Sequence, residues 1–219
     1  MPEGKPRAVL FDLDGTLADT APDLARALNR VRAACGLAPM PLETTRPHTS
    51  SGARGLLKVG LGIEPGNERY EALRAQFLDF YSADICVDTH LFEGMAELFD
   101  RLEQFGLPWG VVTNKAERFT FALLQGLGLD ARAACIVGGD TTPRLKPYPD
   151  SLLHAAAALD LPSAACLYVG DDLRDVQAAR AAGMRVLAAR YGYLGDGEPI
   201  ESWQADAIIE HPSQVIDFL

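Results

Sequence analysis

Asp12 and Asp14, two aspartates separated by one residue, follow the apolar run 8–11 and precede Gly15. Because alternate side chains of an extended strand point to the same side, both carboxylates are expected on one face until Gly15 lets the chain turn. Two like charges this close are stabilised by a hard cation with oxygen ligands, or by a raised pKa that leaves one carboxyl group protonated. Either arrangement is typical of a reactive site.

The same motif has two simpler interpretations. Aspartate and glycine form turns, so the segment can merely end a strand. An Asp-x-Asp-Gly sequence also opens many calcium-binding loops, but such a loop lies between helices and needs a glutamate at its twelfth position, where this chain has Asp23. The choice between these interpretations depends on the residues at the ends of the other strands.

Polar side chains also lie beyond the ends of three later apolar runs, which are predicted to be the strands 109–112, 134–137 and 166–169; Lys146 lies in the loop 138–147 that succeeds the second of these runs. In open α/β sheets, ligands bind outside the carboxyl ends of the strands, so the residues that succeed these runs are expected to share one rim. These residues are Thr113, Asn114, Lys146, Asp171, Asp172 and Asp175.

This set of groups suits phosphoryl transfer, in which catalysis is mostly positioning and charge stabilisation. Mg²⁺ can be held by Asp12, Asp171 and a backbone carbonyl near Asp14, together with phosphate oxygen and water. Lys146 would offset the phosphate charge, and Thr113 would donate a hydroxyl hydrogen bond. Asp12 is the candidate nucleophile, which would form an aspartyl phosphate. Asp14 is the candidate acid and base.

Each later residue also has a structural interpretation when it is taken alone. Thr113 and Asn114 can simply end a strand, and Lys146 can be a solvated loop lysine. Asp171 and Asp172 can cap the helix that comes after them. Their joint appearance at successive strand ends favours a common site.

Composition narrows the classes of partner. The chain has 219 residues, 48% of them hydrophobic, with a net charge of -10 and a pI near 4.8. An acidic surface repels nucleic acid and anionic membranes, so we expect a small-molecule phosphate ester as partner, no nucleic acid, no membrane, and a monomer or homodimer. No secretory signal is visible, and Asp160 and Pro162 interrupt the longest alanine-rich segment, so a cytoplasmic protein is expected.

The cysteines have no metal-finger spacing, and each has apolar neighbours. We expect buried thiols in a reducing compartment. They are Cys35, Cys86, Cys135 and Cys166.

Strands and helices alternate over most of the chain, which predicts a parallel sheet with helices on both faces. The exception is the segment 17–89, which shows helical periodicity over 22–35 and 67–84, a polar Ser/Thr/Gly-rich piece at 43–55 between them, and no convincing strand. It is therefore predicted to be a helical insertion, with residues 1–16 and 90–219 forming the core. The remaining predicted strands are 7–11, 185–189 and 207–209, and the remaining predicted helices are 95–105, 119–127, 149–159 and 173–182.

Four segments resemble the four motifs of the haloacid dehalogenase superfamily, in order and over essentially the whole chain. They are Asp12–Thr16, Thr113–Asn114, Lys146–Pro147 and Gly170–Asp172 with Asp175. The resemblance implies an α/β fold with a Rossmann-like doubly wound parallel sheet core, an inserted α-helical cap, Mg²⁺ dependence and an aspartyl-phosphate intermediate.

The resemblance also implies residue roles. Asp12 would be the nucleophile and Asp14 the acid/base, while Thr113 and Lys146 would bind phosphate. The metal ligands would be Asp12, Asp14 and Asp171, with Asp172 and Asp175 supporting the metal.

Within the superfamily, the opening motif and the segment 146–149 are similar to phosphoglycolate phosphatases. The segments 91–95, 109–115, 170–175 and 190–193 resemble the branch of N-acetylmuramic acid 6-phosphate phosphatases. The hinge departs from the Pro-Gly pattern common in the glycolate enzymes, which argues against their substrate here. The sequence does not name the substrate, and N-acetylmuramic acid 6-phosphate is one candidate.

The cap is expected to select the substrate, because its closure excludes water and adds contacts remote from phosphorus. Arg54 can grip a substrate carboxylate in a bidentate pair. The candidate substrate-binding residues are Ser50, Ser51, Gly52 and Arg54 in the cap, and Thr113, Asn114 and Lys146 in the core.

Other activities share parts of this pattern. A β-phosphoglucomutase uses the same core and nucleophile, although Thr16 favours a phosphatase, and a dehalogenase lacks the second carboxylate that Asp14 supplies. Phosphonate hydrolysis would need a cap lysine, for which Lys58 is the candidate. A phosphorylatable receiver-type signalling domain combines similar groups, but its phosphoacceptor comes after the third strand, whereas this acidic motif comes after the first.

Overall fold

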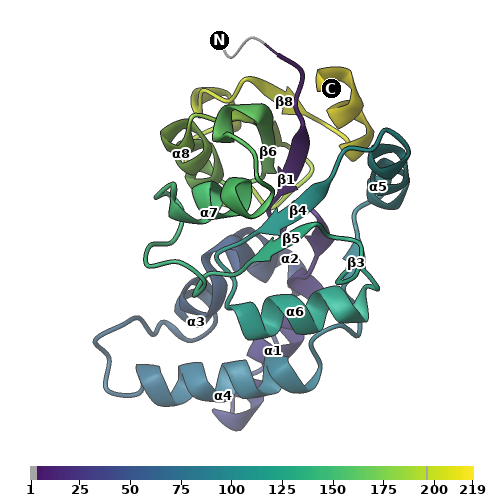
Figure 1. The fold of residues 1–219 in the computed structure, drawn as a ribbon. Helices are drawn as coiled ribbons and strands as arrows, with labels where there is room; N and C mark the ends of the chain where they lie inside the picture. Colours follow the sequence, from purple (N-terminus) through teal and green to yellow (C-terminus); the bar gives the residue numbers. More distant parts are fainter. Residues whose placement is uncertain (1–3, 196) are drawn as a thin grey trace.

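The computed structural model describes residues 4–195 and 197–219, which form a sheet flanked by helices and a cluster of helices beside one end of that sheet (Figure 1). Short 3-10 helices, labelled η, connect several elements. In chain order the elements are β1 (Ala8–Phe11), β2 (Ala18–Asp19), α1 (Ala21–Ala34), α2 (Leu42–Thr45), η1 (Arg46–Ser51), α3 (Gly52–Leu61), α4 (Tyr70–Ala83), β3 (His90–Leu91), α5 (Met95–Gln104), β4 (Trp109–Val112), α6 (Glu117–Gly126), β5 (Cys135–Val137), α7 (Asp150–Ala158), η2 (Ser163–Ala165), β6 (Cys166–Gly170), α8 (Leu173–Ala182), β7 (Arg185–Ala189), η3 (Ile200–Ser202), β8 (Ala207–Ile209) and η4 (Pro212–Phe218).

The main sheet has six strands in the order β5-β4-β1-β6-β7-β8, and each neighbouring pair is parallel. The first strand therefore lies in the middle, between β4 and β6, and the strand order reverses beside it. This arrangement confirms the predicted doubly wound α/β sheet. It also places the residues after β1 at a switch point, where open α/β sheets bind ligands.

Alternate residues of β1 face opposite sides of the sheet. Val9 and Phe11 join a buried cluster with α5 and α6, while Ala8 and Leu10 join a second cluster with α7 and α8. All four are fully buried, as expected for a strand that is covered on both faces. The apolar run before Asp12 thus packs into two hydrophobic clusters, one on each face of the sheet.

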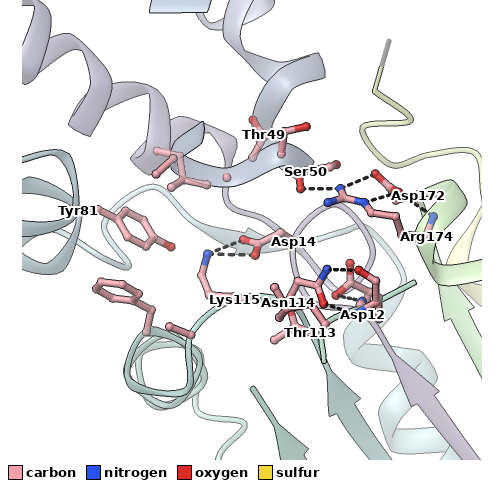
Figure 2. Close-up of a pocket in the computed structure, with 18 of the residues that line it drawn as sticks. Asp12, Asp14, Thr49, Ser50, Tyr81, Thr113, Asn114, Lys115, Asp172 and Arg174 are labelled. Carbon is pink, nitrogen blue, oxygen red and sulfur yellow. Dashed lines mark hydrogen bonds and ion pairs between the residues drawn. The ribbon is translucent and has the colours of Figure 1, made fainter. Parts of the chain in front are cut away.

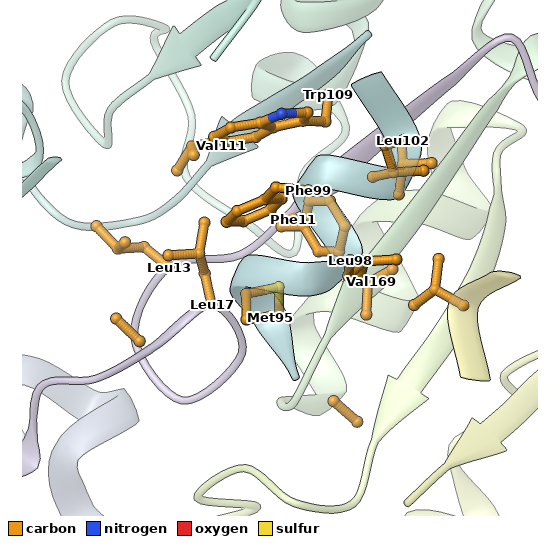
Figure 3. Packing of buried hydrophobic residues seen from close by; sticks show 14 of the residues in the cluster. Phe11, Leu13, Leu17, Met95, Leu98, Phe99, Leu102, Trp109, Val111 and Val169 are labelled. Atoms are coloured by element: carbon orange, nitrogen blue, oxygen red, sulfur yellow. The ribbon is translucent and has the colours of Figure 1, made fainter. Parts of the chain in front are cut away.

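Aromatic packing fixes the strand that carries Asp12 (Figure 3). The Phe99 ring from α5 stacks on Trp109 of β4 with centroids 4.0 Å apart, and meets Phe11 edge to face at 5.7 Å. Such pairs contribute about 0.5–1.5 kcal/mol each beyond the burial of their area. The end of β1 is therefore anchored to its neighbour β4 through one shared ring.

The inserted segment packs around a third cluster, formed by α1, α3 and α4 with Phe119 of α6. The structure departs from the sequence prediction here in two ways. The polar piece around residue 52 begins a helix, α3, whose Leu56 and Leu57 are fully buried in the cluster. The segment also contains a short strand, because β2 pairs antiparallel with β3 as a two-residue ribbon.

The ribbon brings together the two ends of the insertion, since Asp19 pairs with His90 in its register. The other predicted strands and helices are present, with ends shifted by a few residues. Among the described residues, no helix is long and apolar enough to cross a bilayer.

The prediction of buried cysteines holds only for Cys166. The other three thiols are free but partly exposed, because they lie at less protected places than the central strand β6. Cys35 comes after the last turn of α1, Cys86 lies in the loop after α4, and Cys135 begins the edge strand β5.

Candidate active site

Three central strands end side by side at the rim that faces the cap (Figure 2). In the register of the sheet, Phe11 lies opposite Val111 of β4 and Val169 of β6. Asp12 therefore stands level with the last residues of both neighbouring strands. The residues that come after these strands meet there, as the alternation of apolar runs and polar ends predicts.

Gly15 is required by this geometry. It has a φ of 87°, and a β-carbon at this position would lie 2.2 Å from Oδ2 of Asp171. A side chain would therefore be strained by the backbone and would collide with a carboxylate of the site.

Lys146 is the buried cation of the site. Its ammonium lies 2.9 Å from Asp12 and 2.7 Å from Asp175, and it donates to Val112 O and the Tyr168 hydroxyl. Burial by itself would lower the pKa of Lys146, but the two carboxylates outweigh it and hold the pKa above its ordinary value. Lys146 is thus a fixed positive charge beside the candidate nucleophile.

Three buried carboxylates form a group that fits a metal ion. Asp12, Asp171 and Asp175 each place one oxygen within 4.8 Å of the other two. Asp171 also accepts hydrogen bonds from the Thr16 hydroxyl at 2.7 Å and from the Tyr193 amide at 2.8 Å. Burial and the neighbouring carboxylates raise the pKa of Asp171 well above its ordinary value. Three carboxylates beside one lysine leave excess negative charge, and oxygen donors of this kind suit a hard divalent cation.

Asp14 is oriented differently from the predicted metal ligand. Lys115 Nζ contacts both of its carboxylate oxygens, at 2.9 and 3.0 Å, and the Thr20 hydroxyl donates to one of them. Its carboxylate consequently does not belong to the acidic group around Asp12. Only the backbone carbonyl of Asp14 is left as a candidate ligand.

Thr113 and Asn114 differ in whether their side chains still have a group available to bond to a ligand. The Asn114 side chain accepts from the backbone N–H of Lys146 and donates to its carbonyl, so the amide is engaged in both directions. Asn114 therefore holds the loop that carries Lys146. The Thr113 hydroxyl accepts from the Lys115 amide at 3.2 Å and keeps its own hydrogen for donation.

Asp172 has the structural role that the sequence left open. It is the N-cap of α8, in a reciprocal capping box with Asp175. Its carboxylate also holds the guanidinium of Arg174, which reaches across to the Ser50 carbonyl at 2.8 Å (Figure 2). Arg174 thereby links the core to the inserted segment.

A cavity of about 380 Å³ lies between the strand ends and the inserted segment. Of the predicted substrate-binding residues of the cap, Ser50, Ser51 and Gly52 line it, whereas Arg54 is exposed and is not among the lining residues. Lys58 also lies outside the lining and pairs with Glu64 at 2.6 Å, so phosphonate hydrolysis through this lysine gains no support.

A family model described as haloacid dehalogenase-like hydrolase matches residues 9–189. This chain belongs to that family. It is 46% identical over 211 residues to a phosphoglycolate phosphatase of Xanthomonas campestris pv. campestris, covering 96% of this chain and 95% of the relative. It is 43% identical over 209 residues to an N-acetylmuramic acid 6-phosphate phosphatase of Pseudomonas putida, covering 95% and 94%.

The fold of this haloacid dehalogenase-like hydrolase also matches solved structures. A predicted phosphoglycolate phosphatase from Haemophilus somnus superposes with a TM-score of 0.87 at 26% identity, over 98% of both chains. Together, the family match and the named relatives identify the chain as a phosphatase and confirm the resemblance drawn from its four motifs.

Sequence reasoning missed three residues of this haloacid dehalogenase-like site. Lys115 directly follows the motif Thr113–Asn114, so its position in the sequence could have identified it as a site residue. Tyr193 lies in the segment 190–193, which was noted for its resemblance alone, and Arg174 had no signal of its own; the importance of both depends on contacts with distant segments. Tyr193 donates its hydroxyl hydrogen to Asp19 at 3.0 Å and its amide hydrogen to Asp171, which joins the ribbon at the start of the insertion to the acidic group.

Proposed function

We propose that this phosphatase hydrolyses a phosphomonoester of a small sugar acid with Mg²⁺, through an aspartyl phosphate on Asp12. N-acetylmuramic acid 6-phosphate is the substrate that we favour. The observation that carries the proposal is the buried group of Asp12, Asp171, Asp175 and Lys146, of which Asp12, Asp175 and Lys146 line a cavity large enough for a sugar.

In the first step, an Asp12 oxygen forms a bond to phosphorus while the bond between phosphorus and the leaving oxygen breaks. Lys146 and the Thr113 hydroxyl stabilise the charge on the phosphoryl oxygens. A divalent ion at Asp12, Asp171 and the carbonyl of Asp14 would supply further positive charge for the same oxygens. The Asn114 amide keeps Lys146 in place.

Asp14 completes both steps as acid and base. Its proton goes to the leaving alcohol in the first step, and its carboxylate then takes a proton from the water that attacks the aspartyl phosphate. That attack releases inorganic phosphate and restores Asp12. Thr20 and Lys115 hold the Asp14 carboxylate at the cavity, where a leaving group would lie.

The size of the cavity bears on the substrate. Its volume of about 380 Å³ falls in the range of about 300–1,000 Å³ that encloses drug-sized ligands. Phosphoglycolate has only two carbon atoms and would leave much of this space to water. The walls include Leu24, Phe77, Tyr81 and Phe119, whose apolar surfaces suit the carbon face of a sugar ring better than a two-carbon acid.

The proposal is tested by phosphate release from N-acetylmuramic acid 6-phosphate, phosphoglycolate and other sugar phosphates, compared by kcat/KM. Activity should disappear with a chelator, return with Mg²⁺ and be highest for N-acetylmuramic acid 6-phosphate. A kcat/KM that is higher for phosphoglycolate would reject the favoured substrate, and activity without any divalent ion would reject the metal.

The covalent step has its own test. Acid quenching during turnover should trap a hydroxylamine-labile phosphoryl group on the peptide that contains Asp12. With acetyl phosphate and Mg²⁺, the protein should release phosphate catalytically. A lasting stoichiometric adduct would indicate a receiver-type switch instead, and conversion of a sugar 1-phosphate to its 6-phosphate would indicate a mutase.

A further inference from the structure

Two arginines at the cavity have no acidic partner among the described residues. Arg74 comes from the cap helix α4 and Arg118 from the core helix α6, and the side chains of both line the cavity. Neither forms an ion pair within the described part of the chain, although the Arg118 guanidinium lies over the Phe119 ring at 4.4 Å. By contrast, Arg46 and Arg174 nearby are paired with Asp19 and Asp172.

These free cations stand in a chain with a net charge of -10. An exposed arginine is ordinarily only solvated, so the pair alone would not define a site. Here both residues line the same cavity as Lys146, which marks where the phosphate would be held. A ligand with its phosphate at Lys146 and a second anionic group would meet both arginines at the cavity wall.

A buried hydroxyl supports the same conclusion. Tyr81 lines the cavity and is only 2% exposed, and its hydroxyl lies near the Lys115 ammonium without a hydrogen bond of ordinary geometry to any described residue. In Figure 2 its ring projects from the cap toward Lys115 and the cavity. A buried hydroxyl of this kind ordinarily finds a partner, which a polar ligand would provide.

We propose that Arg74 and Arg118 together bind a carboxylate of the substrate, with the Tyr81 hydroxyl bonding to a polar group between that carboxylate and the phosphate. Planar guanidinium groups suit carboxylates because they donate paired hydrogen bonds. This inference rests on the proposed function and narrows it: the enzyme selects phosphorylated sugar acids over neutral sugar phosphates. It also assigns to Arg74 and Arg118 the role that the sequence suggested for Arg54.

Because Arg74 belongs to the cap and Arg118 to the core, a carboxylate bound to both would also connect the two parts of the protein. A substrate carboxylate that binds both arginines would stabilise the closed state, in which the cap covers the core. A substrate without a carboxylate would not stabilise that state. Substrates without a carboxylate would therefore lose affinity and cap closure together, and would be expected to show the higher KM.

The test compares two substrates that share the same amino sugar. N-acetylmuramic acid 6-phosphate carries a lactyl carboxylate, and N-acetylglucosamine 6-phosphate lacks it. Arg74→Gln and Arg118→Gln should each lower kcat/KM for the first by about 10- to 100-fold, mainly through KM, because a hydrogen bond to a charged group is lost. For the second, kcat/KM should change by less than about threefold. Arg74→Lys and Arg118→Lys should give intermediate losses.

Matched controls remove exposed arginines outside the cavity. Arg69→Gln, just before α4, and Arg101→Gln, which like Arg118 lies over an aromatic ring in a core helix, should leave both substrates unaffected. Equal losses for both sugars in the cavity variants would overturn the inference, since the arginines would then act on folding or on the phosphate. A loss confined to Arg54→Gln would also overturn it.

Binding to the Asp12→Asn variant separates this inference from the proposed reaction. Calorimetry with Mg²⁺ measures the affinity for both sugar phosphates without turnover, and should favour the carboxylated one only while Arg74 and Arg118 are present. If the wild-type enzyme releases phosphate from p-nitrophenyl phosphate but shows no such discrimination, the inference fails and the phosphatase reaction stands. If the variant binds the carboxylated sugar phosphate preferentially but the wild-type enzyme releases no phosphate, the proposed reaction fails instead.

Discussion

The two sides of the cavity are held in place by different means. On the core side, Lys146, Asp171 and Asp175 are at most 4% exposed, and each is fixed by several hydrogen bonds or ion pairs. On the cap side, Ser51 and Arg74 are exposed, and the side chains offer few bonds to one another. We call these two sides the floor and the roof.

The difference separates two requirements of catalysis. Reacting groups must be held within fractions of an ångström, which burial and dense bonding achieve at the floor. Selection of a substrate needs a surface that can open and that interacts directly with the ligand, a role that we propose for the roof. Substitutions should therefore affect both activity and stability at the floor, and mainly substrate preference at the roof.

The largest effect on activity is expected at the floor, from Asp12→Asn. Loss of the nucleophile should lower kcat by about a thousandfold or more. Unfolding midpoints measured without metal should stay equal or rise, because the variant removes one of three clustered carboxylates that face a single ammonium. A wild-type rate in this variant would refute the proposed mechanism.

Lys146→Met should lose activity and stability together. The side chain keeps a similar length, but Asp12 and Asp175 lose their buried cation, so urea unfolding should show a loss of about 3–5 kcal/mol. The double variant Lys146→Met with Asp175→Asn should recover part of that stability and none of the activity. If the single variant were as stable as wild type, the floor would not depend on charge pairing.

The contrast between floor and roof also explains which site residues could be predicted from the sequence. Asp12, Thr113, Lys146 and Asp171 could be found because each comes after an apolar run, and parallel strands bring their carboxyl ends to one rim. This logic is local, since it needs only a strand and the segment that follows it. The doubly wound sheet was accordingly predictable, as was the meeting of these side chains at one rim, while their chemical roles stay predictions.

The roof depends on contacts that no local pattern records. The segment around Gly52 looked polar and irregular, yet it starts α3 because Leu56 and Leu57 find partners on α1 and α4. In this helix Arg54 is exposed and is not among the residues that line the cavity. Arg74 and Arg118 line the cavity only because α4 packs near α6, as the Tyr81–Phe119 ring contact at 5.6 Å records.

A moderate effect is expected where the inserted segment joins the core. The Asp23 carboxylate accepts the backbone hydrogens of Val87, Asp88 and Thr89, together with the Thr89 hydroxyl. Asp23→Asn turns one acceptor into a donor that faces other donors, so the free energy of unfolding should fall by about 1–3 kcal/mol. Activity toward small esters should fall less than in the floor variants.

The pH dependence of that loss identifies its cause. Burial raises the pKa of Asp23, but the hydrogen bonds from Thr89, Asp88 and Val87 and the charge of Arg26 outweigh it, so the pKa lies below 3.8. The stabilisation is therefore present above the unfolded pKa and is lost as the pH falls through the folded one. The difference between wild type and Asp23→Asn should be constant from about pH 7 to about pH 5 and smaller near pH 3. A difference that grows on acidification would contradict this assignment.

The smallest effect is expected from the bond that joins floor and roof directly. Arg174 is held by Asp172 in the core and donates to the Ser50 carbonyl in the cap, and its side chain is 36% exposed. Arg174→Gln should cost less than about 1 kcal/mol of stability, because such pairs are partly screened by solvent. Loss of the bond should still favour the open cap, raising KM for N-acetylmuramic acid 6-phosphate a few-fold while kcat for acetyl phosphate stays within about twofold.

Arg180→Gln on the same helix, which removes a pair with Asp206 away from the cavity, is the matched control. If both variants raised KM equally, the effect would belong to α8 as a whole, and the roof would be positioned without the bond between Arg174 and Ser50.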